Sequence, residues 1–347
     1  MYIATLALTI YLYALDHFLK FNKRTKFLIY ATLYIWIIIL LSLLRSDNIP
    51  DTLEYKEIYL FHSMEDIVEK GFMFINKSFL SFGISFHLFL FIYLCFLFCC
   101  FFLCTRKLVE NVNLAFLLFL PYFGFYYFGI IIRVALAISI CFIGITYLLN
   151  HKTSYGICLY YTIVTIAFFI HQTTILFYIL PLVGFINIKK KYLYIILSIG
   201  ILLPFLSLQN HILTQLETIS QLLSFSPRFQ KYIDHADISS QMYGLSKIKF
   251  GLCGILFVYL KDYISPEKLK TYNFFLNTYC IGTILTLMFY FVPAGGRLGE
   301  IFIFFEFILL TYLYEDSSLN KNIVLTALFF NILIEYTMFA RLVPEMI

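Results

Sequence analysis

The chain has 347 residues, of which 61% are hydrophobic, 20% are aromatic and 13% are charged, with a net charge of +5 at pH 7. Soluble globular domains carry about 25% charged residues, so this composition excludes an ordinary soluble protein. The basic residues are scattered over short loops and form no stripe, so we expect no nucleic-acid partner. Continuous apolar runs without period-2 alternation indicate helices, and the chain is predicted to be an all-α polytopic membrane protein.

Twelve apolar runs are candidate transmembrane helices, and we expect about 12 spans, with ten as the lower bound. The runs are residues 2–19, 27–44, 84–104, 113–128, 130–149, 154–170, 172–188, 192–208, 246–261, 271–291, 298–314 and 322–340. The first run lacks a basic leader and a cleavage site, so it is expected to be retained as a span. The whole chain, 1–347, is predicted to be a single transmembrane domain.

Lysine and arginine clusters in alternate short loops fall on one side of the membrane under this assignment, which makes that side cytoplasmic. Both termini then lie outside. Two longer polar segments, residues 45–83 and 209–245, become extracytoplasmic loops. The first is expected to contain a surface helix near residues 64–80.

Four cationic or protonatable side chains fall near the outer face: Arg133, His171, Arg228 and Arg297. An arginine at the bilayer centre costs about 3 kcal/mol on insertion scales, so Arg133 predicts a functional site. Arg133 follows Gly129, and Arg297 follows a PAGG sequence; such helix breaks are tolerated where they line a cavity.

Arginine suits phosphate because its planar guanidinium donates paired, charge-assisted hydrogen bonds. Arg133 and Arg297 could therefore bind the two phosphates of a lipid diphosphate and stabilise it as a leaving group. The alternative is that each arginine pairs with a carboxylate or a lipid head group. Glu300 lies one helical turn from Arg297, so an internal ion pair is also expected there.

His171 could serve as a general base, because its ordinary pKa lies near ambient pH, or as a structural residue at a span end. In the first loop, Asp51, Tyr55 and Glu69 combine carboxylates with an aromatic ring, as sugar binding requires. An amphipathic surface helix explains the same pattern. Arg228 and Tyr232 of the second loop could bind sugar or phosphate, or be solvated.

Several sequence features argue against other chemistries. P-loop, dinucleotide, zinc-protease and serine-nucleophile motifs are absent, so no cofactor and no metal site are expected. The eight cysteines lie in apolar runs and are interpreted as packing residues. Glu306 and Glu335, also in apolar runs, are expected to be satisfied by neighbouring helices.

The motifs together resemble the EpsG-type, Wzy-like polymerases of bacterial surface polysaccharides. They occur in the order D-x3-Y from Asp51, EKGF from Glu69, IIRVALA around Arg133, FFIHQTTIL around His171, PRFQKY around Arg228 and GGRLGEIF around Arg297. The resemblance covers about residues 47–305. It departs where the arginine motif often continues with glutamine, because this chain has Val134.

The resemblance implies a GT-C-like glycosyltransferase in the bacterial inner membrane, with its active site facing the periplasm. The implied reaction moves a growing glycan from undecaprenyl diphosphate onto a new lipid-linked repeat unit, with O-antigen as the expected product. It implies inversion without a metal, and a separate chain-length regulator as partner. Arg133 and Arg297 would hold the donor diphosphate, and His171 would help to activate or place the acceptor hydroxyl. Asp51 and Glu69 are alternative candidates for the general base. Asp51, Tyr55 and Glu69 would line the sugar side, with Arg228, Tyr232 and Glu300 as further substrate contacts.

Three other functions remain open from the sequence. An O-antigen ligase shares the lipid-diphosphate donor and the outer arginines. A flippase of the same lipid-linked units would need cations spread through the depth of the membrane, whereas here they gather on one side. A sugar acyltransferase would need a paired histidine and aspartate near a span end, and the sequence offers none.

Overall fold

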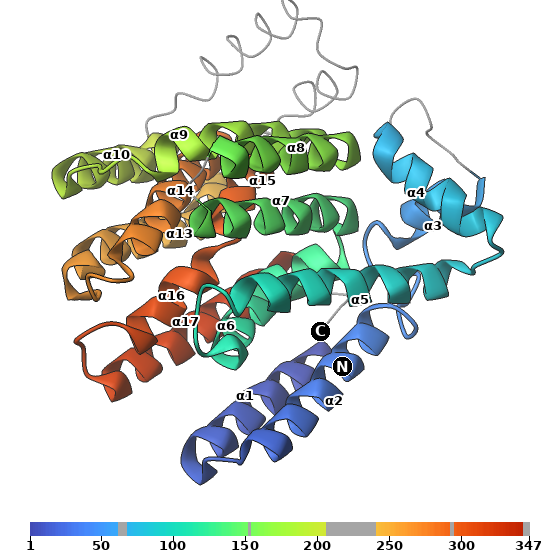
Figure 1. Cartoon of the computed structure of the whole chain (residues 1–347), viewed down its shortest axis with the longest axis horizontal. Coiled ribbons are helices and arrows are strands. Elements are labelled where there is room, and N and C mark those ends of the chain that lie inside the picture. The colour runs from blue at the N-terminus through green and yellow to red at the C-terminus, as the bar shows by residue number, and fades with distance from the viewer. Residues whose placement is uncertain (62–67, 152–153, 206–240, 292–294, 343–347) are drawn as a thin grey trace, which may run out of the picture. The chain divides into compact units, whose positions relative to one another are not determined.

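The structure is a computed structural model that describes residues 1–61, 68–151, 154–205, 241–291 and 295–342 (Figure 1). Every regular element in these ranges is helical, which confirms the predicted all-α class. The chain divides into two compact units. Unit 1 comprises Met1–Tyr178 and Asn320–Ile347, and unit 2 comprises Ile179–Leu319.

Unit 1 is built from long apolar helices with a short helical pair between the second and third of them. The elements are α1 (Tyr2–Leu19), α2 (Lys23–Leu41), α3 (Thr52–Phe61), α4 (Lys70–Ser81), α5 (Phe86–Thr105), α6 (Val112–Phe119), η1 (Leu120–Phe128), α7 (Ile132–Asn150), α8 (Ser154–Ile170), η2 (Gln172–Ile179) and α17 (Lys321–Leu342). Helix α4 covers most of the surface helix expected near residues 64–80, of which residues 64–67 lie outside the described ranges, and α3 precedes it in the same loop.

Helix α7 is the core of unit 1. It packs along α8, as Figure 1 shows, and also against α5 and η1. Most side chains of α7 between Ile132 and Leu148 are buried, and only one face, with Ile140, Ile143 and Tyr147, is partly or fully exposed. The helices α1, α2 and α17 instead expose many large apolar side chains, such as Phe27 and Ile323, as lipid-facing helices do.

The segment η1 is a π-helix, which is wider than an α-helix; it precedes α7 and ends in a break. Its last turn closes with the amide nitrogens of Ile130 and Ile131 both donating to the carbonyl oxygen of Tyr126. The hydroxyl of Tyr93 on α5 then donates to the carbonyl of Ile132 at 2.8 Å. Segments of π-helix are rare and are found frequently at functional sites. Here the break places Arg133 in the first turn of α7.

Five helices of the described chain are long and apolar enough to cross a membrane: α1, α2, α5, α7 and α17. Shorter apolar helices cover residues 112–128, 154–170 and 172–184. The chain is thus a helical membrane protein, and the finer count of about twelve spans stays a prediction. The run predicted at 298–314 is divided, because helix geometry is interrupted at Phe304 and Phe305.

Unit 2 consists of shorter helices and two long ones. The elements are α9 (Leu180–Gly184), α10 (Lys190–Leu202), η3 (Leu203–Phe205), α13 (Gln241–Leu260), η4 (Lys261–Tyr263), α14 (Leu269–Met288), α15 (Gly295–Ile303) and α16 (Glu306–Glu315). Helix α14 is central, because it packs against α9, α10, α13, α15 and α16.

Two lysines of α13 are ion-paired with glutamates inside unit 2. Lys247 pairs with Glu300 on α15, and the Nζ of Lys249 lies 2.9 Å from Oε1 of Glu306 on α16. Both glutamates are buried. The expectation that a neighbouring helix satisfies Glu306 is confirmed, and Glu300 has a lysine as partner. Glu335, in α17 of unit 1, accepts a hydrogen bond from Asn331 in its own helix.

The close contact between α14 and α15 in unit 2 depends on glycine and gives a first prediction. A Cβ at Gly282 would lie 2.6 Å from the carbonyl oxygen of Gly299, whereas a Cβ at Gly200 would lie 3.6 Å from its nearest neighbour, on Leu287. Gly282→Ala should therefore lower the free energy of unfolding by about 1–3 kcal/mol. Gly200→Ala should change it by less than about 1 kcal/mol. Thermal unfolding in detergent measures both, and equal midpoints would contradict the packing described.

Candidate functional site

The site is centred on Glu69, the residue that precedes helix α4. The backbone of Glu69 is extended, and α4 begins at Lys70. Gly71 lies against the end of α8, where a Cβ would be 2.6 Å from the carbonyl oxygen of Phe169. Phe72 then turns inward and is buried. The EKGF sequence thus places a carboxylate at the α8 end, with glycine permitting the close approach.

Arg133 is held by that carboxylate. Its Nη1 donates to Oε2 of Glu69 at 3.1 Å, and the two side chains are 6% and 7% exposed. The guanidinium carbon lies 5.7 Å from the ring centre of Tyr55 and 5.8 Å from that of Phe72. Cation–π contacts of this kind are stronger where water is excluded. Within the described residues, the buried Nε of Arg133 has no hydrogen-bond partner.

His171 contacts the other carboxylate oxygen of Glu69. Helix α8 ends at Ile170, and the backbone nitrogen of His171 still donates to the carbonyl of Ala167. Its Nδ1 lies 2.8 Å from Oε1 of Glu69, in ion-pair contact when the ring is protonated. The backbone nitrogen of Gln172 donates to the same oxygen at 3.4 Å. Glu69 therefore bridges the start of α7 and the end of α8.

These contacts decide the protonation of Glu69. Burial is the largest single influence and favours the neutral acid, but the contact with His171 and the charges of His171 and Arg133 together outweigh it. They hold the pKa of Glu69 at about 2, well below its usual 4.5. The carboxylate is thus ionised at any physiological pH and is a weak base.

Asp51 and Tyr55 lie at the start of α3, and Tyr55 lies beside Arg133. Asp51 adopts a left-handed backbone conformation, with φ at 63°, and its carbonyl accepts a hydrogen bond from the nitrogen of Tyr55 in the first turn of α3. Burial raises the pKa of the Tyr55 hydroxyl, against the opposing effect of Arg133. The ring of Tyr55 packs edge-on against Phe72 at 6.2 Å. Tyr55 therefore contacts the arginine, in addition to any sugar it could line.

The structure brings together five of the predicted site residues in unit 1: Asp51, Tyr55, Glu69, Arg133 and His171. Arg297 and Glu300 belong to α15 of unit 2. The pairing of Arg133 with Arg297 at one diphosphate therefore stays a prediction. Arg228 and Tyr232 lie outside the described residues.

Sequence reasoning missed three charged residues. Lys247 and Lys249, inside the predicted span 246–261, are the partners of Glu300 and Glu306. Arg45, in the loop after α2, is buried at 5% exposure. An arginine directly after an apolar run is usually solvated, so the sequence carries no signal for its burial.

The arrangement offers three chemical capabilities. Buried arginine nitrogen donors can bind a phosphate. An ionised carboxylate on one nitrogen of a histidine can hold the ring so that its other nitrogen accepts a proton. Aromatic rings beside the arginine exclude water, which strengthens both effects. No group of three or more His, Cys, Asp or Glu side chains in the described part of the chain is placed to hold a metal ion.

Comparison with known proteins agrees with the sequence motifs. A family model described as the EpsG family matches residues 28–344, which confirms the expected resemblance. No curated protein and no solved structure matches the chain.

The buried pair gives a second prediction. Glu69→Gln keeps the shape of the side chain but leaves Arg133 without its counter-ion, so it should lower the free energy of unfolding by about 3–5 kcal/mol. Asp47→Asn is the matched control, because it removes the exposed ion pair with Lys56 and should cost no more than about 1 kcal/mol. Denaturation of both variants in detergent tests this. A loss for Glu69→Gln as small as for the control would contradict it.

The ionisation of Glu69 gives a third prediction, on pH dependence. Its folded pKa is below its unfolded pKa, so the stabilisation is fully present above pH 4.5 and is lost as pH falls toward 2. The difference in unfolding midpoint between the wild type and Glu69→Gln should therefore be constant at neutral pH and shrink below pH 4.5. A difference that stays constant down to pH 3 would exclude the depressed pKa.

Proposed function

The chain belongs to the EpsG family, and we propose that it is a membrane glycosyltransferase that polymerises a bacterial surface polysaccharide. The donor in this proposal is a growing glycan on undecaprenyl diphosphate, and the acceptor is a new lipid-linked repeat unit. The reaction takes place at the periplasmic face of the inner membrane, with O-antigen as the favoured product. A chain-length regulator is the expected protein partner.

The observation that carries the proposal is the joint contact of Glu69 with Arg133 and His171. The acceptor hydroxyl forms a new bond to the anomeric carbon of the donor sugar, while the bond from that carbon to the diphosphate oxygen breaks. The electron pair of that bond and a negative charge go to the departing diphosphate. Arg133 stabilises this charge, as arginine does at leaving phosphates.

The proton of the acceptor hydroxyl goes to His171 in this mechanism. Its Nδ1 faces Glu69, so Nε2 remains for the hydroxyl. Glu69 is a poor candidate for the base, because its pKa of about 2 makes it a weak proton acceptor. Glu69 therefore acts as a positioning residue that orients His171 and Arg133. Asp51 and Tyr55 line the approach of the sugar.

Arg297 and Glu300 of unit 2, and Arg228 and Tyr232 of the second loop, are further substrate contacts in the proposal. Their support is the GGRLGEIF and PRFQKY sequences that match the family pattern. A lipid diphosphate supplies its own leaving group, which fits a chain without nucleotide-binding motifs.

The fourth prediction tests the reaction directly. Purified protein in liposomes should lengthen a labelled lipid-linked repeat unit without any nucleotide. Arg133→Gln should lower the elongation rate by at least about 100-fold, because a donor to the developing charge is lost. Lys56→Gln, an exposed cation of α3, should elongate at the wild-type rate.

Three other outcomes would contradict the proposal. Movement of the labelled lipid between leaflets without elongation indicates a flippase. Transfer of a finished glycan to a lipid A core, without elongation, indicates a ligase. Elongation by Arg133→Gln at the wild-type rate removes Arg133 from the reaction.

A further inference from the structure

Two buried ion pairs hold α13 against its neighbours in unit 2. Lys247 pairs with Glu300 on α15, and the two side chains are 13% and 3% exposed. Lys249 pairs with Glu306 on α16, and these side chains are 11% and 1% exposed. The two ammonium nitrogens lie 5.8 Å and 5.0 Å from the ring centre of Phe250. The two pairs are therefore closely matched in burial and chemistry.

The pairs differ in what lies one helical turn from each glutamate. Arg297 precedes Glu300 by three residues on α15, and residues three apart on a helix are neighbours. The residues one turn after Glu306 on α16 are Leu309 and Leu310, which carry no charge. Glu300 is therefore one carboxylate with two cations near it, and one positive charge is in excess.

Close packing fixes the backbone that carries Arg297 and Glu300. Gly299 lies against Gly282 of α14, where a Cβ at Gly282 would be 2.6 Å from the carbonyl oxygen of Gly299. Glu300 is buried, whereas the side chain of Arg297 is exposed. Because this packing leaves little room for α15 to shift, side-chain contacts decide how the charges are shared.

The buried carboxylate of Glu300 needs a counter-ion, because an uncompensated charge in the interior is strongly unfavourable. Lys247 supplies that counter-ion from inside unit 2, so the excess positive charge belongs to the exposed end of α15. Without Lys247, the counter-ion one turn away along α15 is Arg297. A guanidinium that compensates Glu300 alone would attract an anionic ligand much less strongly.

We propose that Lys247 is a positioning residue for Arg297: it compensates the carboxylate of Glu300 and thereby maintains a net positive charge at Arg297 for the diphosphate of the lipid-linked substrate. This inference rests on the proposed function, in which Arg297 contacts the substrate. Lys247 lies outside the motifs that resemble the family. Lys249 has no such role, because its pair with Glu306 is followed by apolar residues.

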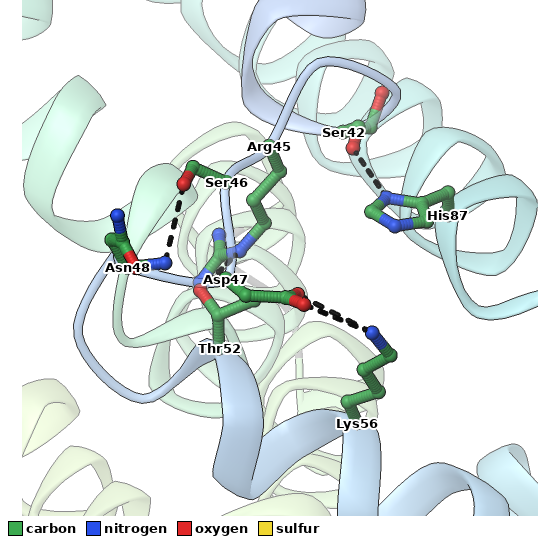
Figure 2. A network of polar contacts seen from close by, with 8 residues as sticks. All are labelled: Ser42, Arg45, Ser46, Asp47, Asn48, Thr52, Lys56 and His87. Atoms are coloured by element: carbon green, nitrogen blue, oxygen red, sulfur yellow. Dashed lines mark hydrogen bonds and ion pairs between the residues drawn. The ribbon is translucent and has the colours of Figure 1, made fainter.

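The test measures binding of farnesyl diphosphate to the full chain in phosphatidylcholine nanodiscs. Lys247→Gln should weaken binding by about 10-fold, as expected for one unit charge at an effective dielectric constant of about 20. Lys249→Gln breaks the matched pair and should bind as the wild type does. The same is expected of Lys56→Gln, which removes an exposed lysine of unit 1 whose Nζ lies 3.1 Å from Oδ2 of Asp47 (Figure 2).

A double-mutant cycle shows whether Lys247 acts through Arg297. Arg297→Gln should weaken binding at least as much as Lys247→Gln does. In the Arg297→Gln background, Lys247→Gln should have no further effect, because the residue through which it acts is gone. Wild-type affinity in Arg297→Gln, or an undiminished effect of Lys247→Gln in that background, overturns the inference.

Thermal unfolding separates this role from a purely structural one. Lys247→Gln and Lys249→Gln each leave a buried glutamate without its lysine, so both should lower the unfolding midpoint by similar amounts. Only Lys247→Gln should lose affinity for the diphosphate. Equal affinities in the two variants would overturn the inference.

Glu300→Gln keeps the experiment decisive if Lys247→Gln does not fold. It removes the carboxylate that competes with the ligand for Arg297, so binding of farnesyl diphosphate should strengthen by about 10-fold. Damage to the structure would weaken binding instead. Unchanged or weaker binding by Glu300→Gln therefore contradicts the inference.

The inference and the proposed function can fail separately. If the wild type elongates lipid-linked repeats, and Lys247→Gln binds and elongates equally well, the role of Lys247 is excluded and the polymerase stands. If diphosphate binding depends on Lys247 through Arg297 but no repeat is elongated, the polymerase is excluded and the role of Lys247 stands.

Discussion

Glu69 makes two ion-pair contacts that link helices of unit 1. One of its carboxylate oxygens contacts Arg133 and the other contacts His171. Each of these charged groups would be costly to bury alone, and here the carboxylate is in ion-pair contact with both neighbours. Two features of the surrounding structure bring these residues together. Gly71 lets the start of α4 reach the end of α8, and the break after η1 sets Arg133 at the first turn of α7. A cation at that helix end is disfavoured by the helix dipole, which makes the carboxylate more necessary.

The cluster also separates the roles of its members. An ionised carboxylate between a guanidinium and an imidazole is too weak a base to take a proton, yet it fixes the orientation of both neighbours. Diphosphate departure and proton removal can therefore be handled by different residues around one anion. This division of labour is the physical content of the proposed glycosyl transfer.

Local sequence patterns predicted the helical class and identified five candidate site residues individually: Asp51, Tyr55, Glu69, Arg133 and His171. They could not show that Glu69 meets Arg133 and His171, because these residues are far apart in the sequence and apolar spans can pair in many ways. Tyr55 and Glu69 were expected to line the sugar, but both also contact Arg133, since the aromatic face and the carboxylate satisfy the buried cation. In the sequence, nothing distinguishes Arg45, Lys247 and Lys249 from ordinary flanking charges. Only the tertiary structure reveals the burial of Arg45 and the ion pairs of the two lysines.

The most direct test is an experimental structure of the wild-type chain in a lipid nanodisc with a bound polyprenyl diphosphate. The account predicts a phosphate within hydrogen-bonding distance of Arg133, with Glu69 still in contact with both Arg133 and His171. A diphosphate bound away from Arg133, or a Glu69 that contacts neither partner, would contradict the central role given to this carboxylate.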